Sequence, residues 1–583
     1  MSDHTKIRIA LIQTNTIVGD LEGNRKKIEN ALESVQKMDC DIITFPELTI
    51  TGYPPEDLLM RRHFLEEQRD TLNKIADDIV DQVVIIGFVD YQGADLFNSA
   101  AVMTKRTIQG IYHKIQLPNY SVFDEERYFV KGHAPLNIQL GEIRIGISIC
   151  EDIWIERAVT ESLALNGGAE IVINISASPY AKGKEYERIQ LVQRHAKYTY
   201  AYMLYNNLVG GQDELVFDGR SLIVDPTGKI LVQGNAFEED VIIADINVQT
   251  VRELRKSKTF EKRKEYLKSD LFHCDLVSVD YEPSKTKEAP IPLRSYDPQS
   301  SQHASVYKAI LLGLSDYVKK NGFKEVVFGL SGGIDSALVA ALAADALGSE
   351  HVHGVTMPTR FSSSGSVEDS ISLANNLQID LRSVAIEDVF QSFLELLKPI
   401  FGDLEFDITE ENIQSRIRGI IVMALSNKFG WLPLATGNKS EVSVGYCTIY
   451  GDMVGGFAPL KDVTKTMVYQ LSEYRNRLAG FDLIPKAVID KAPSAELRPD
   501  QKDQDSLPPY DILDQILELY IEKNTSVTDI VALGYDNDTV RNVARLVDIN
   551  EYKRRQSAPG VKITSLAFGK DRRMPITSSF KGR

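Results

Sequence analysis

The stretch EVVFGLSGGIDSALVAALAADAL, residues 325–347, predicts a strand, a glycine turn and a helix in immediate succession. Residues 325–330 are mostly β-branched and apolar, whereas residues 335–347 carry strong helix formers with apolar side chains at helical spacing. The turn between them reads SGGIDS, residues 331–336. Unpaired backbone N–H groups and the positive end of the helix dipole meet there, and the glycines permit close approach, so we expect an anion-binding loop.

Several functions fit a glycine loop between a strand and a helix. A Walker loop would end in Gly-Lys-Ser/Thr, and the lysine is missing. The G-x-S-x-G nucleophile elbow fits residues 329–333, but a serine hydrolase needs a histidine late in the chain. The histidines after Ser331 are His351 and His353, both in the next predicted strand. A plain glycine turn with a good N-cap is the structural alternative.

The SGGxDS pattern resembles the loop of the ATP pyrophosphatase, or PP-loop, family. The resemblance implies that the loop binds the pyrophosphate of ATP while the α-phosphorus is attacked, and that Asp335 helps to hold Mg²⁺. The residues it assigns to ATP here are Leu330, Ser331, Gly332, Gly333, Ile334, Asp335, Ser336 and Ala337.

Length, charge and cysteine content restrict the class of protein. A chain of 583 residues is too long for one core, so two or more domains are expected. The net charge of -16 argues against a general nucleic-acid or membrane-surface binder. No apolar run approaches membrane-spanning length and the start, MSDHTKIRIA, lacks a signal-peptide core, which predicts a cytoplasmic protein. The four cysteines form neither C-x-x-C pairs nor metal-ligand spacings.

Residues 246–303 separate two regions of different pattern. Charge runs and prolines there predict a linker with one exposed helix. Upstream, residues 5–245 hold many strand-like runs with helical stretches between several of them. Downstream, in residues 304–583, short apolar strands alternate with helices as in a doubly wound parallel sheet. We therefore predict two α/β domains joined by a linker.

Three segments of the first domain place a reactive side chain at the end of a strand-like run. They are FPEL with Glu47, YHKIQLP with Lys114 and ISICEDIW with Cys150. Glu47 can take the thiol proton, the thiolate can attack an amide carbonyl, and Lys114 can stabilise the developing oxyanion. A neighbouring lysine should also lower the pKa of the thiol. Taken singly, each residue has a structural explanation: a packed cysteine, a surface lysine or a charge at a helix start.

Together these segments resemble the nitrilase, or carbon–nitrogen hydrolase, superfamily over residues 5–245, including GRSLIVDPTGKIL at 219–231. The resemblance implies an α-β-β-α sandwich and a Glu-Lys-Cys triad. Glu125 occupies the place of a second supporting glutamate, but Glu126 is adjacent and the choice stays open.

The glutaminase branch of that superfamily implies glutamine contacts at Tyr120, Ser178 and Lys184. Members often carry arginine where Lys184 stands, and a lysine would pair with the substrate carboxylate as a point charge. Each residue has a structural alternative: Tyr120 could lie at the edge of the core, Ser178 could belong to a turn before Pro179, and Lys184 could lie on a solvated helix face.

A glutaminase joined to a PP-loop domain is typical of amidotransferases, which make guanylate, asparagine, thiolated tRNA or NAD⁺. Segments 406–427, 434–452 and 551–564 resemble the NAD⁺ synthetase family, the first through its ENxQ-R-R helix, which carries Gln414 and Arg418. The resemblance implies deamido-NAD⁺ contacts at Asn412, Arg416, Glu441, Asp452 and Lys553, further ATP contacts at Thr436 and Lys465, and a metal held by Asp335, Glu441 and Ser494. Lys562 is the alternative to Lys553.

The combined resemblance implies an ATP-dependent carbon–nitrogen ligase with glutamine as nitrogen donor. Ammonia from glutamine would amidate adenylated deamido-NAD⁺, giving NAD⁺, AMP, pyrophosphate and glutamate, with Mg²⁺ as cofactor. We expect small-molecule substrates, no nucleic-acid or membrane partner, and a homo-oligomer. The alternatives are another PP-loop amidotransferase acting on a different carboxylate and a nucleotide-sensing protein with idle sites.

Overall fold

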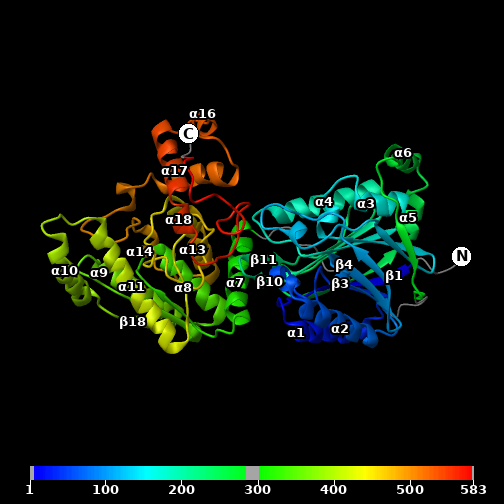
Figure 1. The fold of residues 1–583 in the computed structure, drawn as a ribbon, viewed down its shortest axis with the longest axis horizontal. Helices are drawn as coiled ribbons and strands as arrows, with labels where there is room; N and C mark the ends of the chain where they lie inside the picture. Colours follow the sequence, from blue (N-terminus) through cyan, green and yellow to red (C-terminus); the bar gives the residue numbers. More distant parts are fainter. Residues whose placement is uncertain (1–5, 284–300, 581–583) are drawn as a thin grey trace. The chain divides into compact units, whose positions relative to one another are not determined.

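A computed structural model describes residues 6–283 and 301–580 of the chain (Figure 1). The chain divides into two compact units. Unit 1 comprises the described residues before Ser301 except Asp213–Leu215, and unit 2 comprises those three residues and the described residues from Ser301 onward.

Unit 1 is built on two large sheets. One has the strand order β14-β1-β2-β3-β4-β5, and the other has the order β13-β12-β9-β8-β7-β6-β15. The strands of the first are β14 (Asp240–Asn247), β1 (Lys6–Gln13), β2 (Ile42–Thr44), β3 (Val83–Gln92), β4 (Asp95–Thr104) and β5 (Thr107–His113). Those of the second are β13 (Ile230–Gln233), β12 (Leu222–Val224), β9 (Tyr202–Asn207), β8 (Ile171–Ser176), β7 (Ile143–Ile149), β6 (Leu136–Leu140) and β15 (Asp275–Ser278), and β10 (Val209–Gln212) pairs with β11 (Leu215–Asp218).

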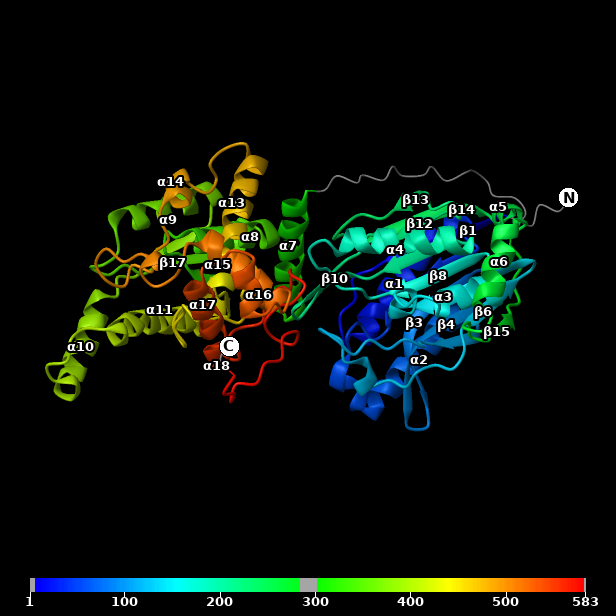
Figure 2. The same cartoon turned by 90° about the horizontal axis from the view of Figure 1, so that it is seen from above.

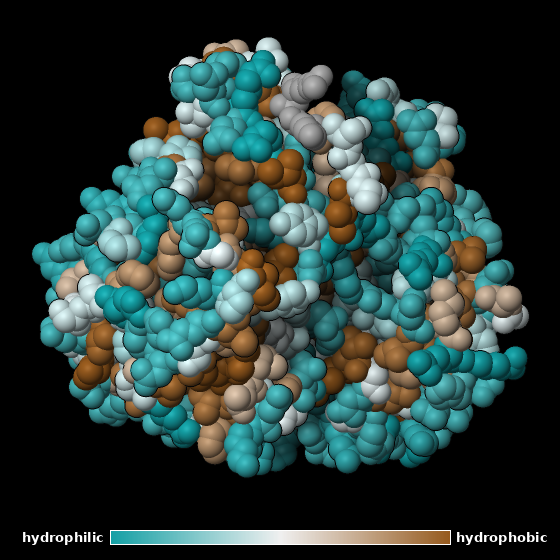
Figure 3. All heavy atoms as spheres, turned by 60° about the vertical axis from the view of Figure 1, so that its left-hand side comes forward, coloured by the Kyte–Doolittle hydropathy of each residue, from teal (hydrophilic) through white to brown (hydrophobic). Residues whose placement is uncertain are grey.

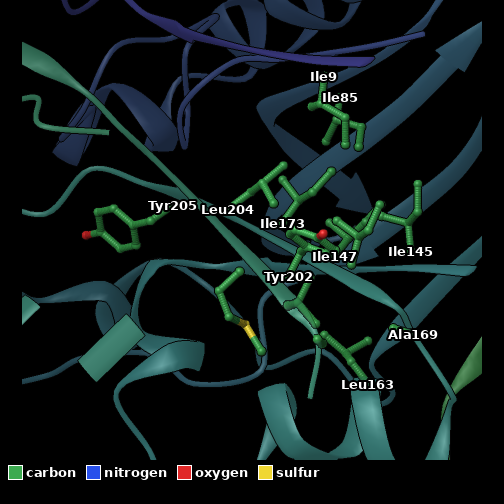
Figure 4. Packing of buried hydrophobic residues seen from close by; sticks show 14 of the residues in the cluster. Ile9, Ile85, Ile145, Ile147, Leu163, Ala169, Ile173, Tyr202, Leu204 and Tyr205 are labelled. Carbon is green, nitrogen blue, oxygen red and sulfur yellow. The ribbon is translucent and has the colours of Figure 1, made fainter. Parts of the chain in front are cut away.

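Helices cover the outer faces of the two sheets. Helices α1 (Leu21–Val35) and α2 (Arg62–Asp78) lie on the side of the first sheet, and α3 (Val159–Glu161) and α4 (Lys184–Thr199) on the side of the second (Figure 1). Both sheets are therefore buried on both faces, which explains continuous apolar strands such as VVIIGFV, residues 83–89, rather than an alternating pattern. The facing side chains, among them Ile9, Ile85, Ile147 and Ile173, form the core (Figure 4). This is the predicted α-β-β-α sandwich.

The structure differs from the expected linker over its first half. Residues 249–278 form α5 (Gln249–Leu254), α6 (Lys258–Leu267) and β15, and β15 pairs in parallel with β6. Phe260 and Leu267 are buried on the inner face of α6. A helix was expected in this segment as an exposed one, but α6 is amphipathic and packs on unit 1, because its few apolar residues anchor it among many charged ones. Residues 284–300 of the expected linker lie outside the described residues, and its last two residues already belong to α7 (Gln302–Lys320) of unit 2.

Unit 2 has a parallel sheet in the order β18-β17-β16-β19. Its strands are β16 (Val326–Gly329), β17 (Val352–Thr356), β18 (Asp380–Ser383) and β19 (Leu432–Pro433). Its helices are α7 (Gln302–Lys320), α8 (Ile334–Leu347), α9 (Ser364–Leu377), α10 (Glu387–Phe401), α11 (Ile408–Phe429), α12 (Lys439–Val444), α13 (Lys465–Ala479), α14 (Lys486–Asp490), α15 (Tyr510–Leu517), α16 (Val527–Ala532), α17 (Asn537–Ile549) and α18 (Glu551–Arg554).

The order in which the chain adds strands to the sheet of unit 2 reverses direction at β16. From β16 the chain moves outward to β17 and β18 and then returns to β19 on the other side of β16. Helices α7, α8 and α13 pack together on one face of the sheet, and α11 lies on the other (Figure 2). Ligands of open α/β sheets bind at such a reversal, outside the carboxyl ends of the strands. The SGGIDS loop follows β16 at this position and leads into α8.

None of the helices in the described ranges is long and apolar enough to cross a membrane.

Candidate active sites

The structure brings Glu47 and Lys114 together in unit 1 and places Cys150 beside them. Lys114 directly follows β5 and Cys150 directly follows β7, so the two come from facing sheets. The Nζ atom of Lys114 lies 2.7 Å from Oε1 of Glu47, and both side chains are fully buried. Cys150 is 3% exposed, and its thiol is close enough to both groups for their charges to shift its pKa. An ammonium, a carboxylate and a thiol thus lie together in one buried site.

Glu125, and not Glu126, completes this charge cluster. Lys114 Nζ lies 2.9 and 2.8 Å from the two carboxylate oxygens of Glu125, and the hydroxyl of Tyr53 donates to Oε1 at 2.9 Å. Glu126 instead pairs with Lys131 at 3.0 Å on the surface. Burial raises the pKa of Glu125 to about 7, while the Lys114 charge opposes that rise. The open choice between the two glutamates is therefore decided by geometry.

The expected fall in the pKa of the Cys150 thiol is wrong. Burial and the Glu47 carboxylate raise that pKa well above its usual value, and the opposing charge of Lys114 does not compensate. At neutral pH the residue is a thiol and needs a base. Glu47 can serve, since its Oε2 is held by the backbone N–H of Ala177 at 2.8 Å and its Oε1 by Lys114.

Two of the three predicted glutamine contacts lie around Glu151, the residue after Cys150. The Tyr120 hydroxyl is 3.0 Å from both carboxylate oxygens of Glu151. The Lys184 ammonium lies 5.5 Å from the centre of the Trp154 ring, and its charge lowers the pKa of Glu151 against the larger, raising effect of burial. Ser178 is buried just after β8, where its backbone N–H donates to Asn207 at 2.9 Å. The group thus presents charges of both signs beside Cys150.

The loop of unit 2 opens into a cavity of about 400 Å³. Most of the residues predicted for ATP line it: Leu330, Ser331, Gly333, Ile334, Asp335, Ser336, Thr436 and Lys465. Gly332 has φ +79°, and a Cβ there would lie 2.3 Å from the carbonyl oxygen of Ser366, so only glycine fits. Gly332 and Ala337 are not among the residues lining the cavity.

Lys465 joins two carboxylates that line this cavity. Its Nζ lies 2.5 Å from Oδ2 of Asp335 and 3.1 Å from Oε1 of Glu441. Asn438 links the same pair: its amide donates to Asp335 at 2.8 Å and its oxygen accepts from the Glu441 backbone N–H at 3.0 Å, capping α12. Burial raises the pKa of Glu441 to about 8, against the Lys465 charge.

These carboxylates fit the predicted Mg²⁺ as a site completed by substrate. In the described part of the chain, no three His, Cys, Asp or Glu residues converge to hold a metal. Asp335 and Glu441 nevertheless approach one cation, the Lys465 ammonium, and Mg²⁺ commonly takes one or two carboxylates plus phosphates and water. Ser494 lines the same cavity, with its hydroxyl donating to the Gln501 carbonyl at 2.5 Å.

The residues predicted for deamido-NAD⁺ divide into two groups. Asn412, Glu441, Asp452 and Lys553 line the cavity, with Lys553 Nζ donating to the carbonyls of Gly445 and Cys447 at 2.7 and 2.8 Å. Lys562 is instead buried in an ion pair with Asp571, which favours Lys553 as the cavity lysine.

Arg416 is exposed and does not line the cavity, whereas Arg418 does. Burial lowers the pKa of Arg418 to about 10, and its Nε donates to the Met357 carbonyl at 3.2 Å. Gln414, on the same helix, is fully buried and bonds to the Leu497 carbonyl at 2.9 Å. Arg416, Arg418 and Gln414 differ in the face of the helix on which they lie, and the spacing of the motif alone does not reveal that difference.

The comparisons with known proteins match both units of the chain. The carbon-nitrogen hydrolase family matches residues 8–256, and the NAD synthase family matches residues 306–557. The glutamine-dependent NAD(+) synthetases of Thermotoga maritima and Aquifex aeolicus are 47% and 44% identical over 99% and 98% of the chain and 99% and 100% of their own lengths. A solved structure of glutamine-dependent NAD+ synthetase from Acinetobacter baumannii with adenosine diphosphate matches with a TM-score of 0.75 and 39% identity, covering 99% of this chain and 100% of that one.

The chain belongs to the glutamine-dependent NAD⁺ synthetase family. The PP-loop interpretation of residues 331–336 is therefore supported over the Walker loop, the nucleophile elbow and a plain turn. In unit 1, motif reading did not single out Glu151, which follows Cys150 and accepts the hydrogen bond of the Tyr120 hydroxyl. An acid directly after Cys150 in ISICEDIW was the available signal. In unit 2 the missed residue is Asn438, whose signal was its place as the N-cap of α12.

Proposed function

We propose that this chain makes NAD⁺ from deamido-NAD⁺, ATP and glutamine, releasing AMP, pyrophosphate and glutamate. Residues 5–245 would act as the glutaminase domain and residues 304–583 as the ATP-dependent synthetase domain. The observation that carries the proposal is the presence, in one chain, of a buried thiol beside Glu47 and Lys114 and of an SGGIDS loop opening into a cavity of about 400 Å³ that also contains Lys465, Asp335 and Glu441.

In the first reaction Cys150 is the nucleophile. Glu47 accepts the thiol proton as sulfur attacks the carboxamide carbon of glutamine, and the Lys114 ammonium stabilises the negative oxygen that forms. The C–N bond then breaks, and Glu47 returns the proton to the departing ammonia. A water molecule, deprotonated by Glu47, hydrolyses the thioester to glutamate and frees the thiol. Glu125 holds Lys114 charged and in place throughout.

Glutamine is selected by the groups around Glu151. Its α-ammonium pairs with the Glu151 carboxylate, and its α-carboxylate pairs with the Lys184 ammonium, with Tyr120 and Ser178 as neutral hydrogen-bonding partners. A simple aliphatic amide lacks both charges and would leave both protein charges unpaired, so it should bind far more weakly.

In the second reaction the nicotinate carboxylate of deamido-NAD⁺ attacks the α-phosphorus of ATP. The backbone N–H groups of the loop and the Lys465 ammonium bind the departing pyrophosphate. Asp335 and Glu441 would hold Mg²⁺, which neutralises phosphate charge when bound. Lys553 orients the nicotinate carboxylate, and ammonia then displaces AMP from the acyl adenylate.

We also propose that the chain works as a homo-oligomer. Leu396 and Ile400 on α10 and Leu404 just after it are 70%, 76% and 80% exposed. Helix α10 lies at the left of Figure 1, the side that Figure 3 brings forward, where brown apolar side chains gather among polar ones. A second copy covering this face would bury apolar surface that a monomer leaves in water. Light scattering of the purified chain should give a mass that is a multiple of the monomer's.

The activity is tested by supplying deamido-NAD⁺, ATP and Mg²⁺ with either glutamine or ammonium and measuring NAD⁺ and AMP. With either nitrogen source, NAD⁺ and AMP should form in equal amounts. If AMP forms with a different carboxylate and no AMP forms with deamido-NAD⁺, the chain is another amidotransferase. If no AMP forms with any acceptor, the result favours a protein that binds nucleotides without turning them over.

A further inference from the structure

Asp152 is a fully buried carboxylate that the reaction scheme leaves without a role. It lies two residues after Cys150, in the single turn Cys150–Ile153 that follows β7. Three donors surround it: the Tyr112 hydroxyl at 2.7 Å, the Ile149 backbone N–H at 2.9 Å and the Gln116 backbone N–H at 2.9 Å.

The three donors flank the two catalytic groups in the sequence. Tyr112 and Gln116 stand two residues before and two residues after Lys114, and Ile149 directly precedes Cys150. Lys114 follows a strand of the first sheet and Cys150 a strand of the second, so Asp152 spans the gap between the sheets where the triad is assembled.

We propose that Asp152 is a positioning residue that fixes the Cys150 turn and the Lys114 segment relative to each other, and thereby sets the distance between sulfur and ammonium. The proposal rests on the glutaminase function proposed above and deepens it.

The backbone of the nucleophile shows why such a restraint is needed. Cys150 has φ +43°, in the left-handed region that non-glycine residues rarely adopt. A strained turn keeps its shape only where neighbouring contacts over-determine it. Asp152 bonds to Ile149 at the start of the turn and to Tyr112 and Gln116 in the Lys114 segment.

The chemistry requires an acid at this position rather than an amide. An ionised carboxylate only accepts hydrogen bonds, which matches three donors. Burial raises the pKa of Asp152 to about 6, so it is still largely ionised at neutral pH. In an asparagine, the NH₂ group would face an N–H or O–H donor and one bond would become a repulsion.

Asp41 offers a matched control in the same unit. It is equally buried and accepts the same kinds of bond, from the Arg8 backbone N–H at 2.7 Å and from the Tyr281 hydroxyl at 2.9 Å. Asp41→Asn therefore measures the general effect of neutralising a buried, tyrosine-bonded aspartate.

The experiment compares Asp152→Asn, Tyr112→Phe and Asp41→Asn in the full chain. Four quantities are measured: kcat and KM for glutamine-driven NAD⁺ synthesis, the ammonia-driven rate, and the rate at which iodoacetamide alkylates Cys150, followed by peptide mass spectrometry. We expect Asp152→Asn to lower the glutamine-driven kcat by about 10²-fold, since small misplacements of catalytic groups have effects of that size. KM and the ammonia-driven rate should stay within about twofold, and Tyr112→Phe should lower kcat by about tenfold. Asp41→Asn should leave all four quantities near their wild-type values.

The proposal is overturned if Asp152→Asn matches Asp41→Asn in kcat and in alkylation rate. If Asp152→Asn also loses the ammonia-driven rate through misfolding, Tyr112→Phe decides, and an unchanged glutamine-driven kcat in that variant contradicts the proposal. Alkylation needs no substrate. It therefore reports the position of the thiol even if the wild-type chain fails to use glutamine, which would refute the proposed function and not this inference.

Discussion

Each unit holds a buried lysine between two carboxylates, and the two groups differ in what surrounds them. Lys114 lies between Glu47 and Glu125, whose side chains are 0% and 6% exposed. Lys465 lies between Asp335 and Glu441, whose side chains are 16% and 18% exposed and line the cavity. The first group is sealed, and the second faces an open space.

This difference indicates two uses of the same charge pattern. In the sealed group the ammonium and carboxylates hold each other at fixed positions beside a thiol, so the reactive geometry exists before substrate binds. In the open group the same charges can be shared with a metal ion and the phosphates of ATP. We therefore expect the first site to be damaged by any change of charge, and the second to respond also to the metal concentration.

The largest expected effect is from Cys150→Ala, which separates the two sites completely. Glutamine-driven NAD⁺ synthesis should fall by more than about 10³-fold, because the nucleophile is removed. Ammonia-driven synthesis should remain near wild type. If both routes survive, unit 1 is not the nitrogen source.

Asp335→Asn is expected to lower both routes by about 10²- to 10³-fold, because the loop loses a charge that would hold the metal and phosphates. The Mg²⁺ concentration needed for half-maximal ammonia-driven synthesis should rise as well. An unchanged rate with an unchanged Mg²⁺ requirement would remove the metal role from Asp335.

Glu125→Gln should affect the sealed group alone. Losing one carboxylate frees Lys114 to move and changes its charge balance, so glutamine-driven kcat should fall by about 10²-fold. The matched control is Glu126→Gln, since Glu126 pairs with Lys131 on the surface and should change kcat by less than about twofold. Equal effects from the two variants would contradict the assignment of Glu125.

The smallest expected effect is on the pH dependence of Cys150 alkylation. Because burial and Glu47 raise the pKa of the thiol, the thiolate fraction is low at pH 7 and should grow about tenfold per pH unit up to pH 9. Glu47→Gln removes a negative charge, lowers that pKa and should speed alkylation at pH 8. A rate already constant above pH 7 would mean a thiolate at neutral pH.

The order of motifs along the chain was enough to predict the two α/β architectures and the family. It could not separate Glu125 from Glu126, because the choice depends on which carboxylate the turn after Asp124 directs inward. Lys553 and Lys562 are both basic residues of one segment, and only the ion pair of Lys562 with Asp571 distinguishes them. Asp152 and Asn438 act through contacts with residues distant in sequence, which no local pattern reveals. The helix expected in the linker is present as α6, but its packing onto unit 1 was not predicted, because the buried residues Phe260 and Leu267 are few among many charges.

The central claim, that nitrogen freed at Cys150 is consumed in the cavity of unit 2, is tested most directly with isotope. Glutamine labelled with ¹⁵N in its side-chain amide is supplied with deamido-NAD⁺, ATP and Mg²⁺, and the product is weighed by mass spectrometry. The account predicts that the wild-type chain makes NAD⁺ one mass unit heavier than unlabelled NAD⁺, and that Cys150→Ala makes no labelled NAD⁺. Glutamate accumulating without labelled NAD⁺ would contradict it.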